Sequence, residues 1–278
     1  MRVAVVGLGA MGSRIAARLL DHGHELVVWN RDAAKAEPLV AQGATAAESP
    51  SAAASAVEAA ITMVTDPDAL AAVTEGEAGV VAGLPEDGFL IQMSTVSPEA
   101  TERLGAAAGG RFLDSPVRGS IGEVESGTLE IFVGGREALV ERARPLLAEL
   151  GDVFPVGGVG AGTAAKLVAN AALVDVIVSL GEALAVGQRL GLDREIVFKV
   201  LSSTPLAATA ERRRASVESG DYAPRFALHL ARKDGDLILA AAGDDLRLTR
   251  AARDWLAEAE ESGLADADYS AVLARILA

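Results

Sequence analysis

The chain contains no cysteine and only three histidines among its 278 residues. Without cysteine there is no disulfide framework, no thiolate nucleophile and no cysteine-based zinc site. The three histidines, His22, His24 and His229, leave little material for a Ser-His-Asp triad or a histidine-rich metal centre. We therefore expect no resident metal ion.

Basic residues are also in the minority, with 25 Lys and Arg against 39 Asp and Glu and a net charge of −14. This balance argues against nucleic acid or an anionic membrane as a partner, although backbone N–H groups can still hold a phosphate. The N-terminus lacks the apolar region and cleavage site of a signal peptide. No run of about 18 uncharged apolar residues is present, so we expect no membrane-spanning helix and a cytoplasmic location.

Short β-branched runs alternate with alanine-rich helical stretches in the first half, a pattern typical of parallel strands joined by helical crossovers. After Gly160 only helices are expected. The sequence therefore predicts an α/β Rossmann-type N-terminal domain (1–160) and an all-α C-terminal domain (161–278), joined by a long interdomain helix. The expected strands are Val3–Val6, Glu25–Trp29, Ala60–Val64, Phe89–Met93, Arg111–Leu113, Thr128–Val133 and Phe154–Val156. The expected helices are Ser13–Asp21, Ala33–Ala41, Pro98–Ala108, Glu137–Leu150, Thr163–Leu190, Arg194–Leu201 (with Asp193 as its N-cap), Phe226–Ala242, Leu246–Ser262 and Ser270–Ala278.

A glycine-rich turn follows the first expected strand and opens the first expected helix. Its residues are Gly7, Leu8, Gly9, Ala10, Met11 and Gly12. In a dinucleotide site one glycine permits the tight turn, one lets the backbone approach the pyrophosphate, and one lets helix and strand pack closely. The free N–H groups at the helix N-terminus then face the phosphates. The strand before it, the helix after it and a second strand ending about 20 residues on favour nucleotide binding over a purely structural turn.

The second expected strand ends in Asn30-Arg31. Enzymes that use NAD usually have Asp or Glu at this point, which accepts a hydrogen bond from the ribose 2′-OH. A guanidinium can instead hold a 2′-phosphate, and Lys35 lies one helical turn further on. These residues favour NADP over NAD, although the neighbouring Asp32 works against it, and the alternative is that Arg31 is a solvated surface residue.

A second glycine motif, Gly160-Ala161-Gly162, opens the long apolar helix and is followed by Lys166 and Asn170. The amine and the amide are four residues apart and therefore share one face of the helix. Further along the same helix, Asp175 and Glu182 also share a face, and we expect them to have a structural role.

Six motifs, in order and across the whole chain, resemble the β-hydroxyacid dehydrogenase family of the 6-phosphogluconate dehydrogenase superfamily. That family includes 3-hydroxyisobutyrate dehydrogenases, tartronate semialdehyde reductases and glyoxylate or succinic semialdehyde reductases. The matching segments are Gly7–Gly12, Asn30-Arg31, Gln92–Pro98, Asp114–Ser120, Gly160–Asn170 and Lys233-Asp234. One such match is weak evidence, whereas the ordered set is specific.

The resemblance implies an NADP(H)-dependent oxidoreductase, with NAD(H) also usable, that interconverts a small β-hydroxyacid and its aldehyde or semialdehyde. Nicotinamide would supply the hydride. Lys166 would act as general acid and base, and Asn170 would orient Lys166 or bind the substrate oxygen. The implied partners are a small anionic substrate and further copies of the chain in a homodimer or homotetramer.

The resemblance also implies two sets of binding residues. The cofactor set is Gly7, Leu8, Gly9, Ala10, Met11, Gly12, Asn30, Arg31, Val64, Thr65, Thr95 and Lys233. The substrate set is Ser94, Thr95, Arg118, Gly119, Ser120, Lys166, Asn170, Lys233 and Asp234. Ser94 and Thr95 have a second interpretation as caps of the helix after Pro98. Lys233 also has a second interpretation, as an ion-pair partner of Asp234 or Asp236 on a solvated face.

The chain departs from the family pattern at three positions. Arg118 stands where the family usually has Ser, and Ser120 stands where it often has Gly. Ala169 stands where the family usually has Asn, and this position would lie off the helix face that carries Lys166. Arg118 would bind a substrate carboxylate as a bidentate pair, fill the pocket and change specificity, or point away and leave binding to the backbone. Two other functions stay open: an imine reductase of the same superfamily, which typically lacks this Lys, and a non-catalytic NADP-binding regulator whose pocket Arg118 blocks.

Overall fold

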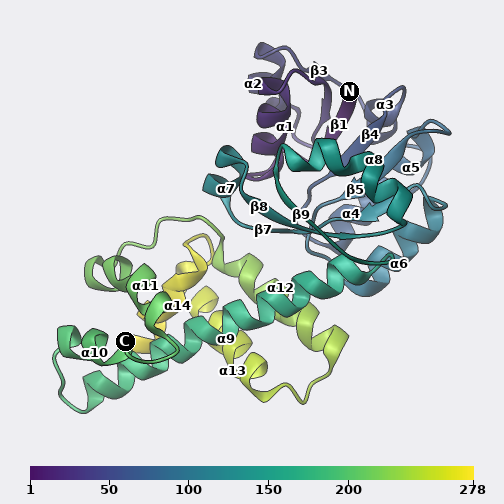
Figure 1. Cartoon of the computed structure of the whole chain (residues 1–278). Helices are drawn as coiled ribbons and strands as arrows, with labels where there is room; N and C mark the ends of the chain where they lie inside the picture. Colours follow the sequence, from purple (N-terminus) through teal and green to yellow (C-terminus); the bar gives the residue numbers. More distant parts are fainter. The chain divides into compact units, whose positions relative to one another are not determined.

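The computed structural model describes all 278 residues and divides into two compact units, Met1–Lys166 and Leu167–Ala278 (Figure 1). The first unit is a sheet with helices on both faces, and the second consists of helices. Helix α9 (Ala161–Arg189) begins at the end of the first unit and continues into the second. The predicted fold class, a Rossmann-type domain followed by a helical domain with a long helix, is confirmed.

One nine-stranded sheet forms the frame of the first unit, with strand order β3-β2-β1-β4-β5-β6-β8-β7 and with β9 paired to β8. The strands from β3 to β6 in that order are parallel, whereas β8 is antiparallel to β6 and β7. The order changes direction at β1 and β4, where open α/β sheets bind their ligands beyond the carboxyl ends of the strands. The strands are β1 (Arg2–Val6), β2 (Glu25–Trp29), β3 (Thr45–Ala46), β4 (Ala59–Thr62), β5 (Phe89–Gln92), β6 (Phe112–Asp114), β7 (Val117–Arg118), β8 (Leu129–Gly134) and β9 (Gly151–Gly157).

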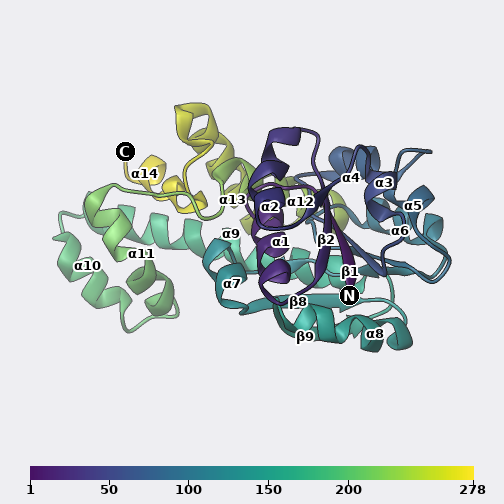
Figure 2. The same cartoon turned by 90° about the horizontal axis from the view of Figure 1, so that it is seen from above.

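The central strands are almost continuous apolar runs because helices cover both faces of the sheet. Val5 and Ile61 belong to the core on the face covered by α1, α2, α7 and α8, whereas Val6 and Leu90 belong to the core under α3 to α6 (Figure 2). All four are fully buried, and burying each contributes about 1.5–3 kcal/mol. The helices are α1 (Gly12–Asp21), α2 (Glu37–Ala41), α3 (Pro50–Ala54), α4 (Pro67–Thr74), α5 (Val80–Gly83), α6 (Pro98–Ala107), α7 (Ile121–Ser126) and α8 (Glu137–Ala148).

Three helices on one face of the sheet begin in the same way. Ser49, Asp66 and Ser97 each precede a proline, and each side chain accepts the backbone N–H three residues later. The side chain satisfies one of the N–H groups that a helix start leaves free, and proline has no N–H to satisfy. These caps fix where α3, α4 and α6 begin after their strands.

The second unit packs its helices around the inward face of α9. Val174, Ile177, Leu180 and Leu184 of α9 lie in its core, all at most 3% exposed. The remaining helices are α10 (Arg194–Leu201), α11 (Ala207–Ser219), α12 (Leu228–Ala242), α13 (Arg247–Ala259) and α14 (Val272–Leu277).

Helix α9 is long and apolar enough, by length and composition, to cross a membrane. The expectation of no run of about 18 uncharged apolar residues still holds, because Lys166, Asp175 and Glu182 interrupt the apolar residues of this helix. The face of α9 that packs in the core of the second unit accounts for part of this composition, and 44% of the apolar window is buried.

The structure contains several elements that the sequence analysis did not predict, and these are the strands β3 and β7 and the helices α3, α4, α5, α7 and α11. Helix α11 was not expected, because only Ala210 and Val217 of its residues are buried and the apolar pattern is correspondingly weak. Residues 33–41 form a 3-10 turn followed by α2 rather than one helix. Asp193 does occupy the N-cap position of α10, but its side chain makes no capping hydrogen bond.

Candidate active site

The glycine-rich turn between β1 and α1 is shaped by two close backbone contacts. Gly7 has a φ of +97°, which a side chain would strain, and its N–H donates to the Trp29 carbonyl at 2.9 Å. A Cβ on Gly12 would lie 1.9 Å from the Gly7 carbonyl oxygen, so helix and strand meet where only glycine fits. A Cβ on Gly9 would meet nothing within 4 Å. The turn therefore leaves open space at Gly9, in front of the N-terminus of α1.

At the end of β2, Asn30 and Asp32 are both engaged by the protein itself. The Asn30 side-chain oxygen accepts the Leu8 N–H at 2.9 Å, and its amide donates to the Asp32 carbonyl at 2.9 Å. The Asp32 carboxylate accepts the Ala34 N–H and caps the following 3-10 turn. Arg31 is exposed and has no hydrogen bond or ion pair. Asn30 thus holds the glycine turn, and Arg31 is the charged group available to a ligand.

The segments after β4 and β5 are tied to each other. The Val64 N–H donates to the Ser94 hydroxyl at 2.9 Å, and Ser94 is only 1% exposed. Thr65 is exposed and Thr95 half-buried, so both are accessible beyond the carboxyl ends of the strands. The interpretation of Ser94 or Thr95 as the cap of α6 is wrong, since Ser97 accepts the N–H of Ala100.

The loop around Arg118 binds carboxylates that belong to the chain. Arg118 lies directly opposite Glu130 in the β7–β8 pair, and its guanidinium donates to both carboxylate oxygens. This pairing raises the pKa of Arg118 and lowers that of Glu130. The backbone N–H and hydroxyl of Ser120 both donate to one oxygen of Glu123, at 2.8 and 2.7 Å. Gly119, between them, has a φ of +130°. The groups assigned to a substrate carboxylate are therefore held by internal carboxylates.

Lys166 and Asn170 both lie on the buried side of α9, 9% and 3% exposed respectively. The Asn170 amide donates to Asp234 of α12 at 2.6 Å, and the Lys233 amine lies 2.9 Å from the other oxygen of the same carboxylate. Asp234 is 2% exposed, so the Lys233–Asp234 pair is not on a solvated face as its alternative interpretation required. The Lys233–Asp234 pair instead holds the side-chain amide of Asn170, which lies one helical turn after Lys166.

The two carboxylates further along α9 have local partners. Asp175 accepts the Thr249 hydroxyl at 3.2 Å, and Glu182 accepts the indole N–H of Trp255 at 3.0 Å. These bonds join α9 to α13, which is a structural role. No group of three or more His, Asp or Glu side chains is arranged to hold a metal ion.

Asp114 is a residue to which the sequence analysis assigned no role of its own. It is fully buried at the end of β6, and its two oxygens accept the N–H groups of Gly160 (3.1 Å) and Thr163 (2.8 Å) at the start of α9. Burial raises the pKa of this carboxyl to about 6, and the N–H groups of Thr163 and Gly160 oppose that rise. The signals in the sequence are an acidic residue that ends an apolar strand and its place at the start of the matching segment Asp114–Ser120.

Two family models match the chain in tandem. The NAD binding domain of 6-phosphogluconate dehydrogenase matches residues 2–160, and the NAD-binding domain of NADP-dependent 3-hydroxyisobutyrate dehydrogenase matches residues 160–276. The first alone spans more than half of the chain.

Full-length relatives agree with these matches. The 3-sulfolactaldehyde reductase of Escherichia coli (strain K12) is 35% identical, over 99% of this chain and 95% of that protein. Glyoxylate/succinic semialdehyde reductase 1 of Arabidopsis thaliana is 32% identical, over 98% and 97%. A structure of Mycobacterium tuberculosis 3-hydroxyisobutyrate dehydrogenase with L-serine has a TM-score of 0.90 at 28% identity, covering 100% of this chain and 99% of that one.

Alanine at Gly12 and at Gly9 should have opposite effects. Gly12→Ala places a methyl group against the Gly7 carbonyl, so we expect a loss of about 1–3 kcal/mol in the free energy of unfolding. Gly9→Ala has room in the protein, so stability should change by less than about 0.5 kcal/mol. The added methyl group would still obstruct a pyrophosphate, and dinucleotide binding should weaken about tenfold or more.

Urea unfolding and fluorescence titration with NADPH measure the two effects separately. Unchanged NADPH affinity in a folded Gly9→Ala variant would show that the cofactor does not approach this turn.

Proposed function

This chain belongs to the β-hydroxyacid dehydrogenase family, and from that premise we propose that it interconverts a small hydroxy acid and its aldehyde with NADP(H), using Lys166 as general acid and base. The observation that supports it is the buried Lys166–Asn170 pair on one face of α9, in a chain whose glycine turn fits a dinucleotide. Family membership makes the chain an NAD(P)-dependent oxidoreductase of hydroxy acids and semialdehydes.

Carbonyl reduction needs a hydride at carbon and a proton at oxygen. The nicotinamide, when bound, supplies the hydride, which no side chain can do. The Lys166 ammonium then gives its proton to the developing alkoxide, and the neutral amine removes the proton in the reverse direction. Lys166 is one of only four lysines in the chain, and it is the only one in the first turns of α9.

Asn170 has the position of an orienting group. One N–H of its amide is used by Asp234, which fixes the plane of the amide. The second N–H and the carbonyl oxygen remain to hold either the substrate oxygen or the Lys166 amine. Lys233 neutralises Asp234, so the buried carboxylate does not stand alone.

We propose that NADP(H) is preferred over NAD(H) because the charges at the end of β2 suit a 2′-phosphate. Arg31 has no partner within the protein. The Asp32 carboxylate accepts the Ala34 N–H and so caps the 3-10 turn that follows it. A carboxylate that accepts a backbone N–H is less available to repel a phosphate, and an unpaired guanidinium can bind one.

The proposed substrate is a small aldehyde that carries an anionic group. Both relatives described above are named for such compounds, sulfolactaldehyde in one and glyoxylate or succinic semialdehyde in the other. In this chain Arg118 and Lys233 are the cations assigned to the anionic end, and each already has an internal carboxylate partner. A substrate anion would therefore compete with Glu130 for Arg118.

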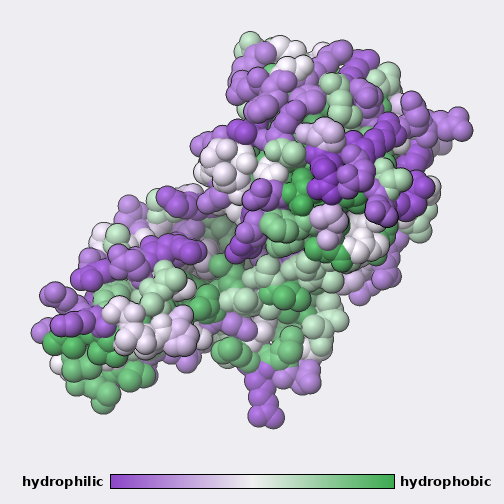
Figure 3. All heavy atoms as spheres, in the orientation of Figure 1, coloured by the Kyte–Doolittle hydropathy of each residue, from purple (hydrophilic) through white to green (hydrophobic).

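We further propose that the protein is cytoplasmic and forms a homodimer or homotetramer through its helical unit. Apolar side chains that are 47–74% exposed gather at the end of α9 and on α10, where Figure 3 shows hydrophobic atoms at the surface. They are Val186, Leu190, Leu192, Ile196 and Val200. A contiguous apolar surface of this kind marks an interaction site, and a second copy is the partner that the family resemblance implies.

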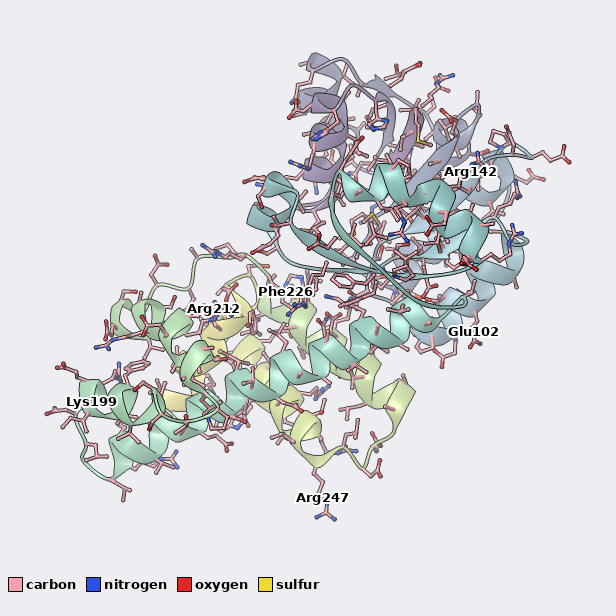
Figure 4. The ribbon with its side chains drawn as sticks, viewed as in Figure 1. Glu102, Arg142, Lys199, Arg212, Phe226 and Arg247 are labelled. Atoms are coloured by element: carbon pink, nitrogen blue, oxygen red, sulfur yellow. The ribbon has the colours of Figure 1, made fainter.

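Lys166→Ala should reduce kcat about 100-fold or more, the scale of a lost general acid, and leave the Kd for NADPH nearly unchanged. Lys199→Ala is the matched control, since Lys199 is an exposed lysine on α10 (Figure 4). Stopped-flow absorbance of NADPH and fluorescence titration give the two quantities. Equal losses of turnover and NADPH affinity would remove Lys166 from the chemistry.

Arg31→Ala should weaken NADPH about 10- to 100-fold and leave NADH binding nearly unchanged, since only NADPH has a 2′-phosphate to lose an ionic contact. The ratio of the two Kd values measures this effect and cancels any general damage to the site. A ratio equal to that of the wild type would place Arg31 outside the 2′-phosphate site.

Glu130→Gln tests whether Arg118 contacts the substrate. Removing the internal carboxylate frees the guanidinium, so KM for an anionic aldehyde should fall about 2- to 5-fold, the scale of an exposed ion pair. Arg118→Ser should raise the same KM. If neither variant changes KM, Arg118 points away from the substrate and the loop backbone does the binding.

A further inference from the structure

Asp114 joins the sheet to the helix that carries Lys166. It is the last residue of β6 and is in register with Gln92, the last residue of β5, which is in register with Thr62 of β4. All three side chains are fully buried. Of these, Asp114 accepts two backbone N–H groups from a segment 46 and 49 residues further along the chain. A strand-end carboxylate thus occupies the place of an N-cap for α9.

The first turn of α9 is pressed closely against this strand end. A Cβ on Gly162 would lie 2.4 Å from the Asp114 carbonyl oxygen and 2.6 Å from that of Phe132, so only glycine permits the approach. A Cβ on Gly134, in β8, would lie 2.3 Å from the Asp114 carboxylate. Two glycines from different elements therefore form the slot that holds the carboxylate.

A second contact fixes the same turn from another side. The hydroxyl groups of Thr101, in α6, and Thr163 are 2.8 Å apart, and both residues are at most 2% exposed. Thr163 is thus held through its N–H by Asp114 and through its hydroxyl by α6. Lys166 follows three residues later, one turn along the helix.

We propose that Asp114 is a positioning residue for Lys166: its carboxylate seats the first turn of α9 on the end of β6 and so sets where the Lys166 amine is held. This inference rests on the proposed function of Lys166. A carboxylate suits the task better than a neutral cap, because it offers two acceptor oxygens to the positive end of the helix. A shift of Lys166 by a fraction of an ångström would then reduce kcat without disturbing the glycine turn.

The hydrogen bonds that act on the Asp114 carboxyl come from its own backbone N–H, from Thr163 in α9 and from Gly160 just before that helix. Burial raises its pKa to about 6, against the N–H groups of Thr163 and Gly160 and the Thr163 hydroxyl. Protonation as the pH falls through this value removes one acceptor from the cap. The kcat of the wild-type protein should therefore decline below about pH 6, because the Asp114 carboxyl becomes protonated.

Asp114→Asn is the direct test, because it keeps the shape, removes the charge and points an N–H at a backbone N–H. We expect kcat to fall about 10- to 100-fold, the Kd for NADPH to stay unchanged, and the decline of kcat below pH 6 to disappear. The matched control is Asp175→Asn. Asp175 lies in α9, the helix that carries Lys166, and burial raises its pKa as well. Its carboxylate accepts a hydrogen bond from the Thr249 hydroxyl and none from the start of the helix. The control should keep kcat within about twofold.

Thr101→Ala is a milder variant that removes only the hydroxyl contact to Thr163, and it should lower kcat about 3- to 10-fold with NADPH affinity intact. Unchanged kcat in either Asp114→Asn or Thr101→Ala would overturn the inference, as would a parallel loss of NADPH binding. If Lys166→Ala itself leaves kcat unchanged, the proposed function fails. If Lys166→Ala abolishes turnover and Asp114→Asn does not alter it, only the positioning role of Asp114 fails.

Discussion

The close contact between the end of β6 and the start of α9 is the constraint on which the functional part of the molecule depends. Asp114 needs two donors because it is buried, and Gly160 and Thr163 provide them only if the first turn of α9 lies against the strand. That approach in turn requires glycine at positions 134 and 162. The motif from Gly160 to Asn170 thus combines a helix start that is held against the sheet with the two side chains proposed to act in the reaction, one and two turns later.

The glycine turn after β1 applies the same physical principle to the cofactor. Gly12 has no room for a side chain because α1 starts against the Gly7 carbonyl, and this contact presents the helix N-terminus beyond the carboxyl ends of the strands. Asn30 holds the turn through Leu8, so the residue next to the phosphate-binding candidate Arg31 is itself a structural support. At the start of α1 and at the start of α9, a close approach between a glycine and a neighbouring backbone fixes the position of the helix N-terminus.

The sequence was sufficient for features that depend on local pattern or on ordered motifs. The central strands, the glycine turn, the start of α9 and the Lys166–Asn170 face follow from apolar periodicity and spacing along one element. Contacts across elements could not be predicted in this way. The Arg118–Glu130 pair depends on the β7–β8 register, and the Asp114 contacts join segments 46 to 49 residues apart. Helix α11 escaped detection because so few of its residues are buried.

The account is tested most directly by following NADPH absorbance with the unmodified protein against a panel of small carbonyl compounds. The panel holds glyoxylate, succinic semialdehyde, methylmalonate and tartronate semialdehydes, a sulfonate and a phosphonate aldehyde, a neutral aldehyde of matched size and a cyclic imine. We predict turnover of at least one anionic aldehyde, with kcat/KM well above that for the neutral aldehyde, and no turnover of the imine. Reduction of the imine in preference to every aldehyde acid would contradict the account and favour an imine reductase.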